Sequence, residues 1–392
     1  MAIAWTEAFS SFLPVGAGWQ NYDIYTLLGV PKGAIAEIII HSVNNAVNRI
    51  VGVRTDGSAL NRTINLHEAE GGGATHVNML VKVHATTGLI ETYCDSTTGI
   101  TFYLTGYWTG VDFTEMASTF VPTGTATWQD KNLQSAFEVP KGRVCQIHVY
   151  HNTQDAAKIA GVRTDGSTLE RKMSIHEAEG TVTATNGYDT YVKTSVADGI
   201  IETYGTDIFS VYFLLLGYFD STMDYTELWT QKDITTADVW TDFDLTADLD
   251  QDGRVTNFVL THSNANTEAN LGARVDGSLL FRYILEHESE TNAYTGFGII
   301  VQSNPSTGIV ELLAGVTADY FWLAGYFKEV AVGEVIETIT AKNFPMLYLA
   351  KPVKTQELIS KVEGATITKV ANDFPLELLK EGKGKELKSK WS

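Results

Sequence analysis

Hydrophobic and polar residues alternate along most of the chain up to about residue 330, in short runs separated by residues that favour turns. A period of two places successive side chains on opposite faces of an extended strand. Turn residues return roughly every eight to twelve positions, a spacing typical of antiparallel strands in a two-sheet sandwich. Near the N-terminus this pattern predicts strands at residues 19–28, 34–43, 49–54, 60–67, 77–83, 89–93 and 101–108.

The pattern occurs three times, and three short motifs mark each copy. They are an Arg-x-Asp-Gly-Ser turn at Arg54, Arg163 and Arg274, a His-Glu pair at His67, His176 and His287, and a Gly-Tyr-aromatic triplet at Gly106, Gly217 and Gly325. The turn residues Asp56, Asp165 and Asp276 lie 109 and 111 residues apart. This period exceeds the roughly 20 to 50 residues of solenoid repeats and matches a domain with its own core. The sequence therefore predicts an all-β protein with three tandem antiparallel β-sandwich domains, at residues 1–117, 118–228 and 229–328.

The Asp-Gly pair in each copy is the clearest local signal. Both central residues of a type I′ hairpin turn need a positive φ, which aspartate tolerates and glycine adopts freely. We therefore expect a tight hairpin at each Arg-x-Asp-Gly-Ser motif, with the turn fixing the register of its two strands.

Residues 329–392 have a different composition and form a fourth region. They contain a shorter duplication, with Asn343-Phe344-Pro345 in one half and Asp373-Phe374-Pro375 in the other. Proline behind a polar cap suits the first position of a helix. We expect a small C-terminal appendage, helical or α/β, with helical turns over 356–361 and 385–390. From Ala341 to Ser392 there are ten lysines and six acidic residues, so this part of the appendage is basic.

The whole chain carries a formal net charge of −19. An acidic body argues against nucleic-acid binding, because phosphate contacts need clustered lysine and arginine. The two cysteines, Cys94 and Cys145, fall at unmatched places, which indicates no disulfide framework. The N-terminal residues lack the pattern of a secretory signal, and no apolar run is long enough for a membrane span.

One polar constellation recurs in every copy. Each copy contributes a hairpin arginine and a His-Glu pair at the end of a strand: Arg54, His67 and Glu68; Arg163, His176 and Glu177; Arg274, His287 and Glu288. A second acid follows at Glu70, Glu179 and Glu290, and a further arginine precedes each histidine at Arg62, Arg171 and Arg282. A metal site needs three or four convergent ligands, and no second ligand segment is present. The sequence therefore favours ion pairs between strands or between copies over a metal site.

The third copy alone has an acidic loop, Asp248-Leu249-Asp250-Gln251-Asp252-Gly253. Alternate carboxylates in one tight loop suit calcium. Val259 stands where an EF-hand has its bidentate glutamate, so a plain acidic hairpin is the alternative. Asp248, Asp250 and Asp252 are the candidate ligands of a structural calcium ion, and the sequence predicts no other cofactor.

With these motifs the copies resemble jelly-roll or similar β-sandwich domains of virion structural proteins of tailed phages and related viruses, such as capsid decoration, turret and fibre proteins. The resemblance implies a jelly-roll-like fold, location in the virion after synthesis in the host cytoplasm, and assembly with copies of itself and with capsid or tail proteins. It implies no catalytic residues. Three like modules in one chain can also close into a pseudo-trimer, in which covalent linkage replaces a homotrimer.

Two other functions stay open at this point. The closing strands are rich in aromatic residues such as Trp108, which suit either a core or a stacking surface for sugars in a carbohydrate-binding protein. A glycan-active enzyme needs two carboxylates at a set distance. Glu91, Glu202 and Glu311 recur, but outside the His-Glu pair no second acid keeps step with them. We therefore expect no enzyme.

Overall fold

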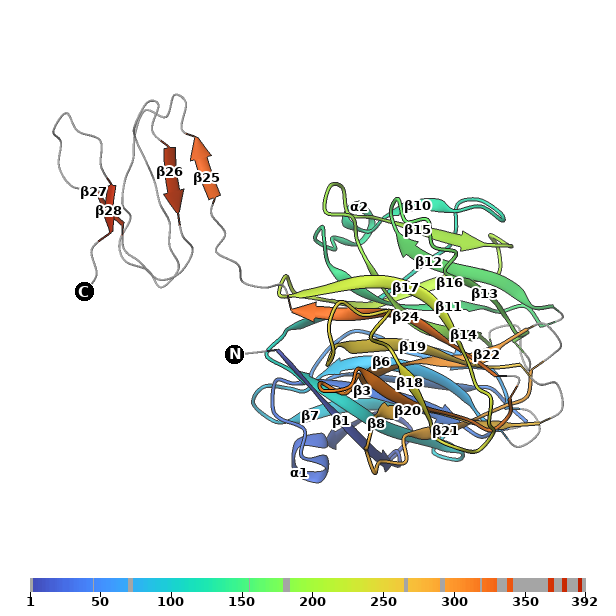
Figure 1. The fold of residues 1–392 in the computed structure, drawn as a ribbon. Coiled ribbons are helices and arrows are strands. Elements are labelled where there is room, and N and C mark those ends of the chain that lie inside the picture. Colours follow the sequence, from blue (N-terminus) through green and yellow to red (C-terminus); the bar gives the residue numbers. More distant parts are fainter. Residues whose placement is uncertain are drawn as a thin grey trace. The chain divides into compact units, whose positions relative to one another are not determined.

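The computed structural model describes residues 3–329 except 45, 70–72, 155, 179–183, 264–266, 290–292 and 318, and the backbone of four short strands beyond them. The chain divides into two compact units, Met1–Glu329 and Val330–Ser392. The first unit contains three β-sandwiches, each built from two four-stranded antiparallel sheets (Figure 1). The fold is thus the predicted series of antiparallel sandwiches.

In the first sandwich an inner sheet has the order β1-β8-β3-β6 and an outer sheet the order β2-β7-β4-β5. This alternation of sequential strands between two sheets is jelly-roll-like. Its elements are β1 (Ala4–Phe12), β2 (Gly18–Asp23), α1 (Ile24–Leu28), β3 (Ile35–Ser42), β4 (Arg49–Thr55), β5 (Thr63–Leu66), β6 (Thr75–Lys82), β7 (Leu89–Cys94) and β8 (Ile100–Thr109).

The second and third sandwiches repeat this topology, with inner sheets β9-β16-β11-β14 and β17-β24-β19-β22 and outer sheets β10-β15-β12-β13 and β18-β23-β20-β21. The second contains β9 (Phe113–Phe120), β10 (Gln129–Asn132), α2 (Leu133–Phe137), β11 (Val144–His151), β12 (Lys158–Thr164), β13 (Lys172–Ile175), β14 (Asn186–Lys193), β15 (Ile200–Gly205) and β16 (Val211–Phe219). The third contains β17 (Met223–Asp233), β18 (Thr241–Asp244), β19 (Val255–His262), β20 (Ala269–Val275), β21 (Tyr283–Glu286), β22 (Thr295–Gln302), β23 (Ile309–Ala314) and β24 (Tyr320–Glu329).

The expected strands of the first copy are present, with one correction. Residues 19–28 form a strand followed by the one-turn helix α1, because Thr26 N donates to the Asp23 side chain and Gly29 closes the turn in the left-handed conformation. The pattern also missed β1, because buried and exposed positions do not alternate regularly along this strand.

The expected sandwich boundaries need a small shift. The expected boundary at 117/118 falls inside β9, and the one at 228/229 falls inside β17. β9 pairs with β16 and so belongs to the second sandwich, and β17 pairs with β24 and so belongs to the third. Each sandwich therefore begins at its own edge strand, close to residues 113 and 223. The four middle residues of β9, Glu115 to Ser118, are all half-buried, so the period-two signal is weak where the boundary lies.

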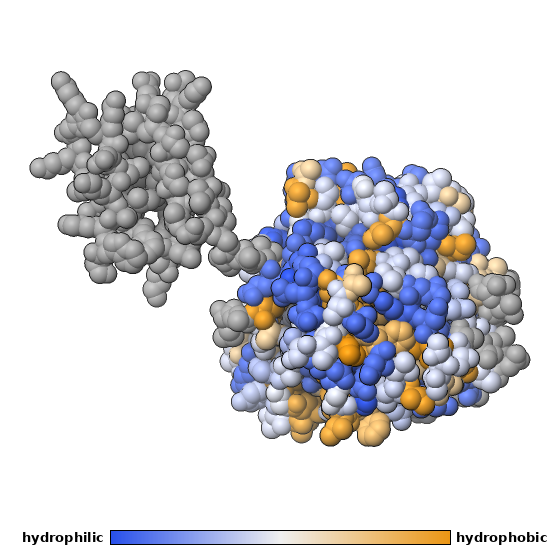
Figure 2. Space-filling model, viewed as in Figure 1, coloured by the Kyte–Doolittle hydropathy of each residue, from blue (hydrophilic) through white to orange (hydrophobic). Residues whose placement is uncertain are grey.

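Each sandwich has its own apolar core between its two sheets. Representative fully buried residues are Phe102 in the first core, Phe213 in the second and Phe321 in the third. On the face of this unit that Figure 2 shows, hydrophilic residues predominate, with smaller hydrophobic patches between them. Burial of the alternate strand positions is what holds each pair of sheets together.

Backbone hydrogen bonds join the three sandwiches in a closed cycle, first to second, second to third and third to first. In each bond the amide of the motif histidine donates to a carbonyl of the next sandwich: His67 N to Thr185 O (3.2 Å), His176 N to Tyr294 O (2.9 Å) and His287 N to Ala74 O (3.1 Å). The inner strands β6, β14 and β22 also contact one another in all three pairs. The three inner sheets therefore enclose a common centre.

The second unit is described only through four short strands, in which β25 (Glu337–Thr340) pairs with β26 (Thr366–Lys369) and β27 (Leu376–Leu378) with β28 (Leu387–Ser389). The helical turn expected over 385–390 is therefore extended at β28. The backbone register of this pair sets Lys388 opposite Glu377. The other expected helical turn, 356–361, lies outside the described residues.

Candidate functional site

The hairpin arginines form ion pairs within each outer sheet. Arg54 and Glu91 face each other in the register of β4 and β7, and the other two sandwiches repeat the pair. The nitrogen–oxygen distances are 2.6 Å for Arg54–Glu91, 2.8 Å for Arg163–Glu202 and 2.8 Å for Arg274–Glu311. In each outer sheet the hairpin arginine thus joins its own strand to the neighbouring one.

A second set of arginines lies at the junctions between sandwiches. Each is fully buried and pairs with a glutamate on the first strand of the next sandwich. The pairs are Arg62–Glu115 (3.5 Å), Arg171–Glu227 (2.6 Å) and Arg282–Glu7 (2.8 Å). They follow the same cycle as the backbone hydrogen bonds. These ion pairs between copies are of the predicted kind, but the sequence analysis did not identify their glutamates.

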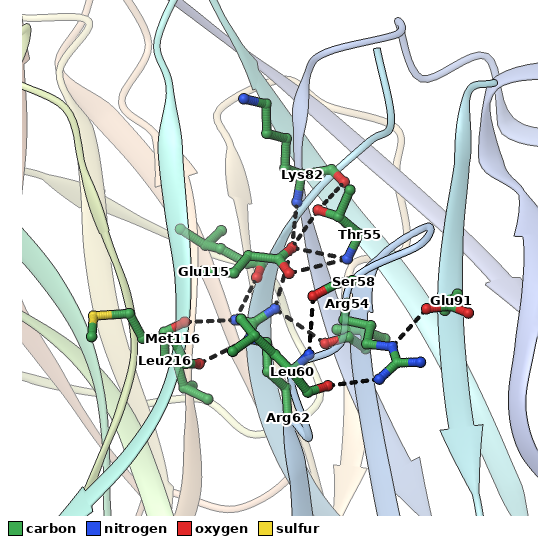
Figure 3. Close-up of polar contacts among 12 residues, drawn as sticks. Arg54, Thr55, Ser58, Leu60, Arg62, Lys82, Glu91, Glu115, Met116 and Leu216 are labelled. Atoms are coloured by element: carbon green, nitrogen blue, oxygen red, sulfur yellow. Dashed lines mark hydrogen bonds and ion pairs between the residues drawn. The ribbon is translucent and has the colours of Figure 1, made fainter. Parts of the chain in front are cut away.

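Figure 3 shows one of these junctions, where Glu115 of the second sandwich enters the hairpin of the first. Its carboxylate accepts hydrogen bonds from Thr55 N (3.1 Å), Thr55 Oγ1 (2.8 Å) and Lys82 N (3.0 Å). The Arg62 guanidinium donates to Met116 O (3.1 Å) and Leu216 O (2.8 Å), both in the second sandwich. A buried ion pair is stable only when further hydrogen bonds satisfy its charged groups, as they do here.

A β-bulge aims each junction glutamate at its target. The register of β1 against β8 shifts just after Glu7, and Glu115 and Glu227 lie at the matching shifts of β9 and β17. A bulge adds a residue to one strand and turns a side chain away from its regular direction. The glutamate therefore leaves its own sheet and reaches the neighbouring sandwich.

The glycine of the Gly-Tyr-aromatic motif makes room for this bulge. Gly106 lies opposite Glu7, and a Cβ placed on it would come within 2.2 Å of the Trp5 ring. The equivalent distances are 2.3 Å from Gly217 to Phe113 and 2.4 Å from Gly325 to Tyr225. The aromatic ring two residues before each junction glutamate thus packs directly on the glycine backbone. Three sequence triplets mark this arrangement: Trp5-Thr6-Glu7, Phe113-Thr114-Glu115 and Tyr225-Thr226-Glu227.

A buried polar network occupies the centre between the inner sheets. The fully buried Glu37 accepts hydrogen bonds from Asn78 Nδ2 (2.7 Å), from Thr105 Oγ1 (2.5 Å) and from Ile300 N of the third sandwich (2.9 Å). The Arg282 guanidinium lies 3.9 Å away. Burial raises the pKa of Glu37 to about 7, and Arg282 and the hydrogen bonds oppose that rise.

The same network links the second sandwich to the first. Asn78 N donates to Asp189 Oδ2 (2.7 Å), and Leu80 N donates to Gln146 Oε1 (3.0 Å). Gln146 occupies in β11 the position that Glu37 has in β3, opposite the motif glycine. From equivalent positions, Glu37 and Gln146 thus each accept a hydrogen bond from a backbone amide of a different sandwich.

The motif histidines meet at one place in this junction. The ring of His287 lies 4.6 Å from that of His67 and 5.8 Å from that of His176, measured between centroids. Burial lowers the pKa of His67 and of His287 well below the ordinary value and that of His176 to about 4. The three rings are therefore neutral at pH 7. The structure thus places the three histidines at the contacts between sandwiches.

The glutamates of the motif do not follow the histidines inward. Glu68, Glu177 and Glu288 are half-buried, and within the described residues Glu68 and Glu288 form no ion pair. The expected contribution of these two to polar pairing is thus not seen. The second acids Glu70, Glu179 and Glu290 lie outside the described residues.

An aromatic cluster shared by all three sandwiches also packs between the inner sheets. Trp108, Phe219 and Phe327 contribute to it, with Trp108 only 2% exposed. The ring centroid of Trp108 lies 5.2 Å from that of Phe327 and 6.1 Å from that of Phe219. The suggestion that Trp108 forms a sugar-stacking surface is therefore wrong, because its side chain is buried.

Two carboxylates of the acidic loop, those of Asp248 and Asp250, pair with cationic side chains. Asp248 binds Lys232 Nζ at 2.7 Å, and Asp250 binds Arg254 Nε at 2.7 Å and Lys328 Nζ at 3.3 Å. Among the described residues, no group of three or more histidine, cysteine or acidic side chains surrounds a point that could hold a metal ion. Calcium binding by Asp248, Asp250 and Asp252 stays a prediction, which calcium titration of the chain would test.

Within the part of the chain that the structure describes, no helix is long and apolar enough to cross a membrane. No protein family and no curated protein sequence matches the chain.

Similar solved structures include virion proteins. One is described as "Crystal Structure of the STIV MCP", 10% identical, covering 56% of this chain and 97% of that one with a TM-score of 0.26. Another is described as "The Triple Jelly Roll Fold and Turret Assembly in an Archaeal Virus", 7% identical, covering 83% and 90% with a TM-score of 0.20. A third is the CBM22-1–CBM22-2 tandem domain of Paenibacillus barcinonensis Xyn10C, 11% identical, covering 56% and 91% with a TM-score of 0.16. Archaeal virus capsid and turret proteins are thus among the similar structures, but at these TM-scores the likeness carries no argument about function.

Proposed function

We propose that this chain is a structural and assembly protein of a virion, a capsid decoration, turret or tail-fibre component whose three sandwiches act as a pseudo-trimer. The observation that supports this most directly is the closed cycle of contacts. Arg62–Glu115, Arg171–Glu227 and Arg282–Glu7 repeat one interaction three times and return to the starting sandwich. The resemblance of the sequence motifs to virion proteins supplies the biological setting.

A covalently linked pseudo-trimer suits a threefold position of a larger assembly. Three similar faces point away from the common centre, so up to three equivalent contacts can form with a surrounding lattice. Linkage in one chain also keeps the three copies at high effective concentration, which fixes their stoichiometry. We propose capsid or tail proteins and further copies of the chain as the partners.

The use of the recurring carboxylates supports a structural role over catalysis. Glu91, Glu202 and Glu311 are each held by an arginine of the neighbouring strand. A glycosidase acid–base pair instead needs two carboxyl groups that flank a bound substrate. We therefore propose that these glutamates maintain the outer sheets.

Cryo-electron microscopy of the purified chain tests the pseudo-trimer, and proteomics of purified virus particles tests the virion assignment. We expect three sandwiches around one axis, and peptides of this chain at constant stoichiometry to the major capsid protein. Sandwiches arranged in a line would refute the pseudo-trimer. If infected cells express the chain but the purified particles lack it, the virion role is refuted.

Carbohydrate binding is a second candidate, favoured by one repeated surface feature. On each outer sheet a half-buried tryptophan stacks with the hairpin arginine that pairs with glutamate. The guanidinium carbon lies 4.0 Å from the ring centroid for Arg54–Trp19 and 4.1 Å for both Arg163–Trp128 and Arg274–Trp240. An aromatic face beside charged hydrogen-bonding groups is a common way to bind a sugar.

A glycan array separates the two candidates. If the outer sheets bind sugars, Trp19→Ala combined with Trp128→Ala and Trp240→Ala abolishes binding, whereas Phe209→Ala leaves it intact. Phe209 is a suitable control because it is exposed and lies in a loop away from these arginines. An array without specific binding by the unsubstituted chain would reject this candidate and leave the structural role unaffected.

A further inference from the structure

The fold brings together three histidines that the sequence keeps more than a hundred residues apart. His67, His176 and His287 each follow the last strand of an outer-sheet hairpin, β5, β13 and β21. Their backbone amides form the hydrogen bonds that join one sandwich to the next, which fixes the Cα positions. The centroid of the His287 ring lies 4.6 Å from that of His67 and 5.8 Å from that of His176.

The ring nitrogens at this place lack the partners that burial normally requires. Both nitrogens of His67 and both of His287 are buried and form no hydrogen bond with the described residues; His287 Nε2 lies 3.7 Å from the Glu286 carboxyl group, beyond hydrogen-bond distance. The Ser289 hydroxyl, two residues from His287, is likewise buried without a partner. A buried polar atom without a hydrogen bond costs about 1–3 kcal/mol, so a bound ion or water would explain the arrangement.

Space around the rings comes from small residues. Ala69 and Ala178 follow two of the histidines by two positions, where Ser289 follows the third, and all three are buried. Gly73 lies against the backbone of His287, where a Cβ would come within 2.3 Å of the His287 Cα. The small side chains therefore leave room beside the rings, while the backbone at Gly73 packs closely against His287.

We propose that His67, His176 and His287 together bind one late first-row transition-metal ion, such as Zn²⁺, at the centre of the cycle of sandwiches. Each sandwich supplies one imidazole, a ligand type that suits zinc, copper and nickel better than calcium or magnesium. Three imidazole nitrogens at about 2.0–2.1 Å from a tetrahedral zinc place the ring centroids roughly 5 Å apart, between the two separations found here.

The proposal requires the rings to turn about their side-chain bonds, since in the present rotamers no three described ligand residues already surround one point. The imidazoles are neutral at pH 7, the form that coordinates metals. An ion held by one ligand from each sandwich would fasten all three at once. This site is independent of the virion role, because a pseudo-trimer can form with or without it.

Cobalt binding tests the site, with untagged full-length chain from which metals have been removed by chelation and dialysis. We expect one Co²⁺ per chain, a visible d–d absorption band of tetrahedral cobalt with nitrogen ligands, and displacement of that band by Zn²⁺. At a zinc concentration a hundredfold above Kd, the midpoint of thermal unfolding should rise by roughly 5 °C. A chain without stoichiometric cobalt binding would overturn the proposal.

Variants separate these histidines from other metal-binding groups. His67→Asn and His287→Asn should each weaken cobalt binding at least tenfold and remove the absorption band, whereas His84→Asn, at a loop histidine outside the junction, should bind like the unsubstituted chain. Circular dichroism and metal-free unfolding identify any variant that does not fold. In that event His176→Gln, which keeps a polar side chain of similar length, replaces it. Unchanged binding in folded variants, or equal loss in His84→Asn, would refute the site.

Discussion

At the scale of single residues, the chain uses similar side chains for two different purposes. Arg163 and Arg171 lie eight positions apart, yet one holds two strands of its own sheet and the other holds the next sandwich. Burial distinguishes them, since the Arg163 side chain keeps 11% exposure and that of Arg171 only 1%. The energetic consequence of losing a partner should differ accordingly.

Removing the charge of a junction glutamate should therefore destabilise the chain far more than removing that of an outer-sheet glutamate. Glu227→Gln leaves the Arg171 guanidinium buried without its counter-ion and should lower the free energy of unfolding by about 3 kcal/mol. Glu202→Gln, the matched change opposite Arg163, should lower it by no more than about 1 kcal/mol. Urea denaturation of both variants measures the difference. Equal effects would contradict the importance of the junction.

The buried Glu37 should make stability depend on pH. A carboxyl group whose folded pKa is about 7, against an ordinary 4.5, binds its proton more tightly in the folded chain. Its stabilising contribution is complete below pH 4.5 and is lost as the pH rises toward 7. Glu37→Gln removes this loss and matches Gln146 at the equivalent position of the second sandwich.

We expect the stability difference between Glu37→Gln and the unsubstituted chain to move in favour of the variant by about 3 kcal/mol between pH 4.5 and 7. Denaturant unfolding of both chains at several pH values in this range measures this difference. The other titrating groups are the same in both chains, so their contributions to the pH dependence cancel. A difference that is constant with pH, or one that moves the opposite way, would show that Glu37 is ionised in the folded chain.

At the scale of elements, close backbone contacts explain the recurring glycines. In each outer sheet one glycine lies against the carbonyl of the buried arginine: a Cβ would come within 2.0 Å of Arg62 O at Gly52, 2.1 Å of Arg171 O at Gly161 and 2.4 Å of Arg282 O at Gly272. The strand pair that contains the glycine thus also positions the arginine that reaches the next sandwich. Local strand pairing and assembly of the three sandwiches are thereby coupled.

Gly52→Ala should separate β4 from β5 and displace Arg62. We expect a loss of about 1–3 kcal/mol in the free energy of unfolding, the usual range for an overpacked site. Gly16→Ala is the control, because its Cβ would lie 3.5 Å or more from its neighbours, an ordinary contact. Thermal and urea unfolding of the two variants provide the measurement. A Gly52→Ala chain as stable as the control would mean that the strands accommodate the methyl group without strain.

At the scale of the whole molecule, the three sandwiches share too much buried structure to unfold separately. Trp108, Tyr191 and Phe327 come from different sandwiches and belong to one buried cluster. Each sandwich alone would expose its part of this cluster and leave a buried arginine or glutamate without its partner. Cooperative folding is expected when such surfaces are shared.

Differential scanning calorimetry should accordingly show one main transition for residues 1–329, with the calorimetric and van't Hoff enthalpies in agreement. Glu227→Gln should shift this transition as a whole. Three resolved transitions would contradict a single cooperative unit. So would a Glu227→Gln variant in which one part of the chain unfolds at a lower temperature while the rest unfolds at the original temperature.

The sequence by itself determined the local structure and its threefold repetition. Period-two alternation and the Asp-Gly turns at Asp56, Asp165 and Asp276 depend only on neighbouring residues, so they identified the strands and the three copies. The same signals missed helix α1, whose single turn is set by the Asp23 cap and Gly29. They also missed β1 and placed the boundaries inside β9 and β17, where half-buried residues hide the alternation.

Only the tertiary structure decided which copies meet and through which side chains. Glu7, Glu115 and Glu227 gain their role from a bulge and from an arginine in another sandwich, although the repeated aromatic-Thr-Glu triplet was visible in the sequence. The convergence of His67, His176 and His287 likewise depends on closure of the cycle. Such contacts join residues far apart along the chain, and local periodicity contains no information about which distant surfaces pack together.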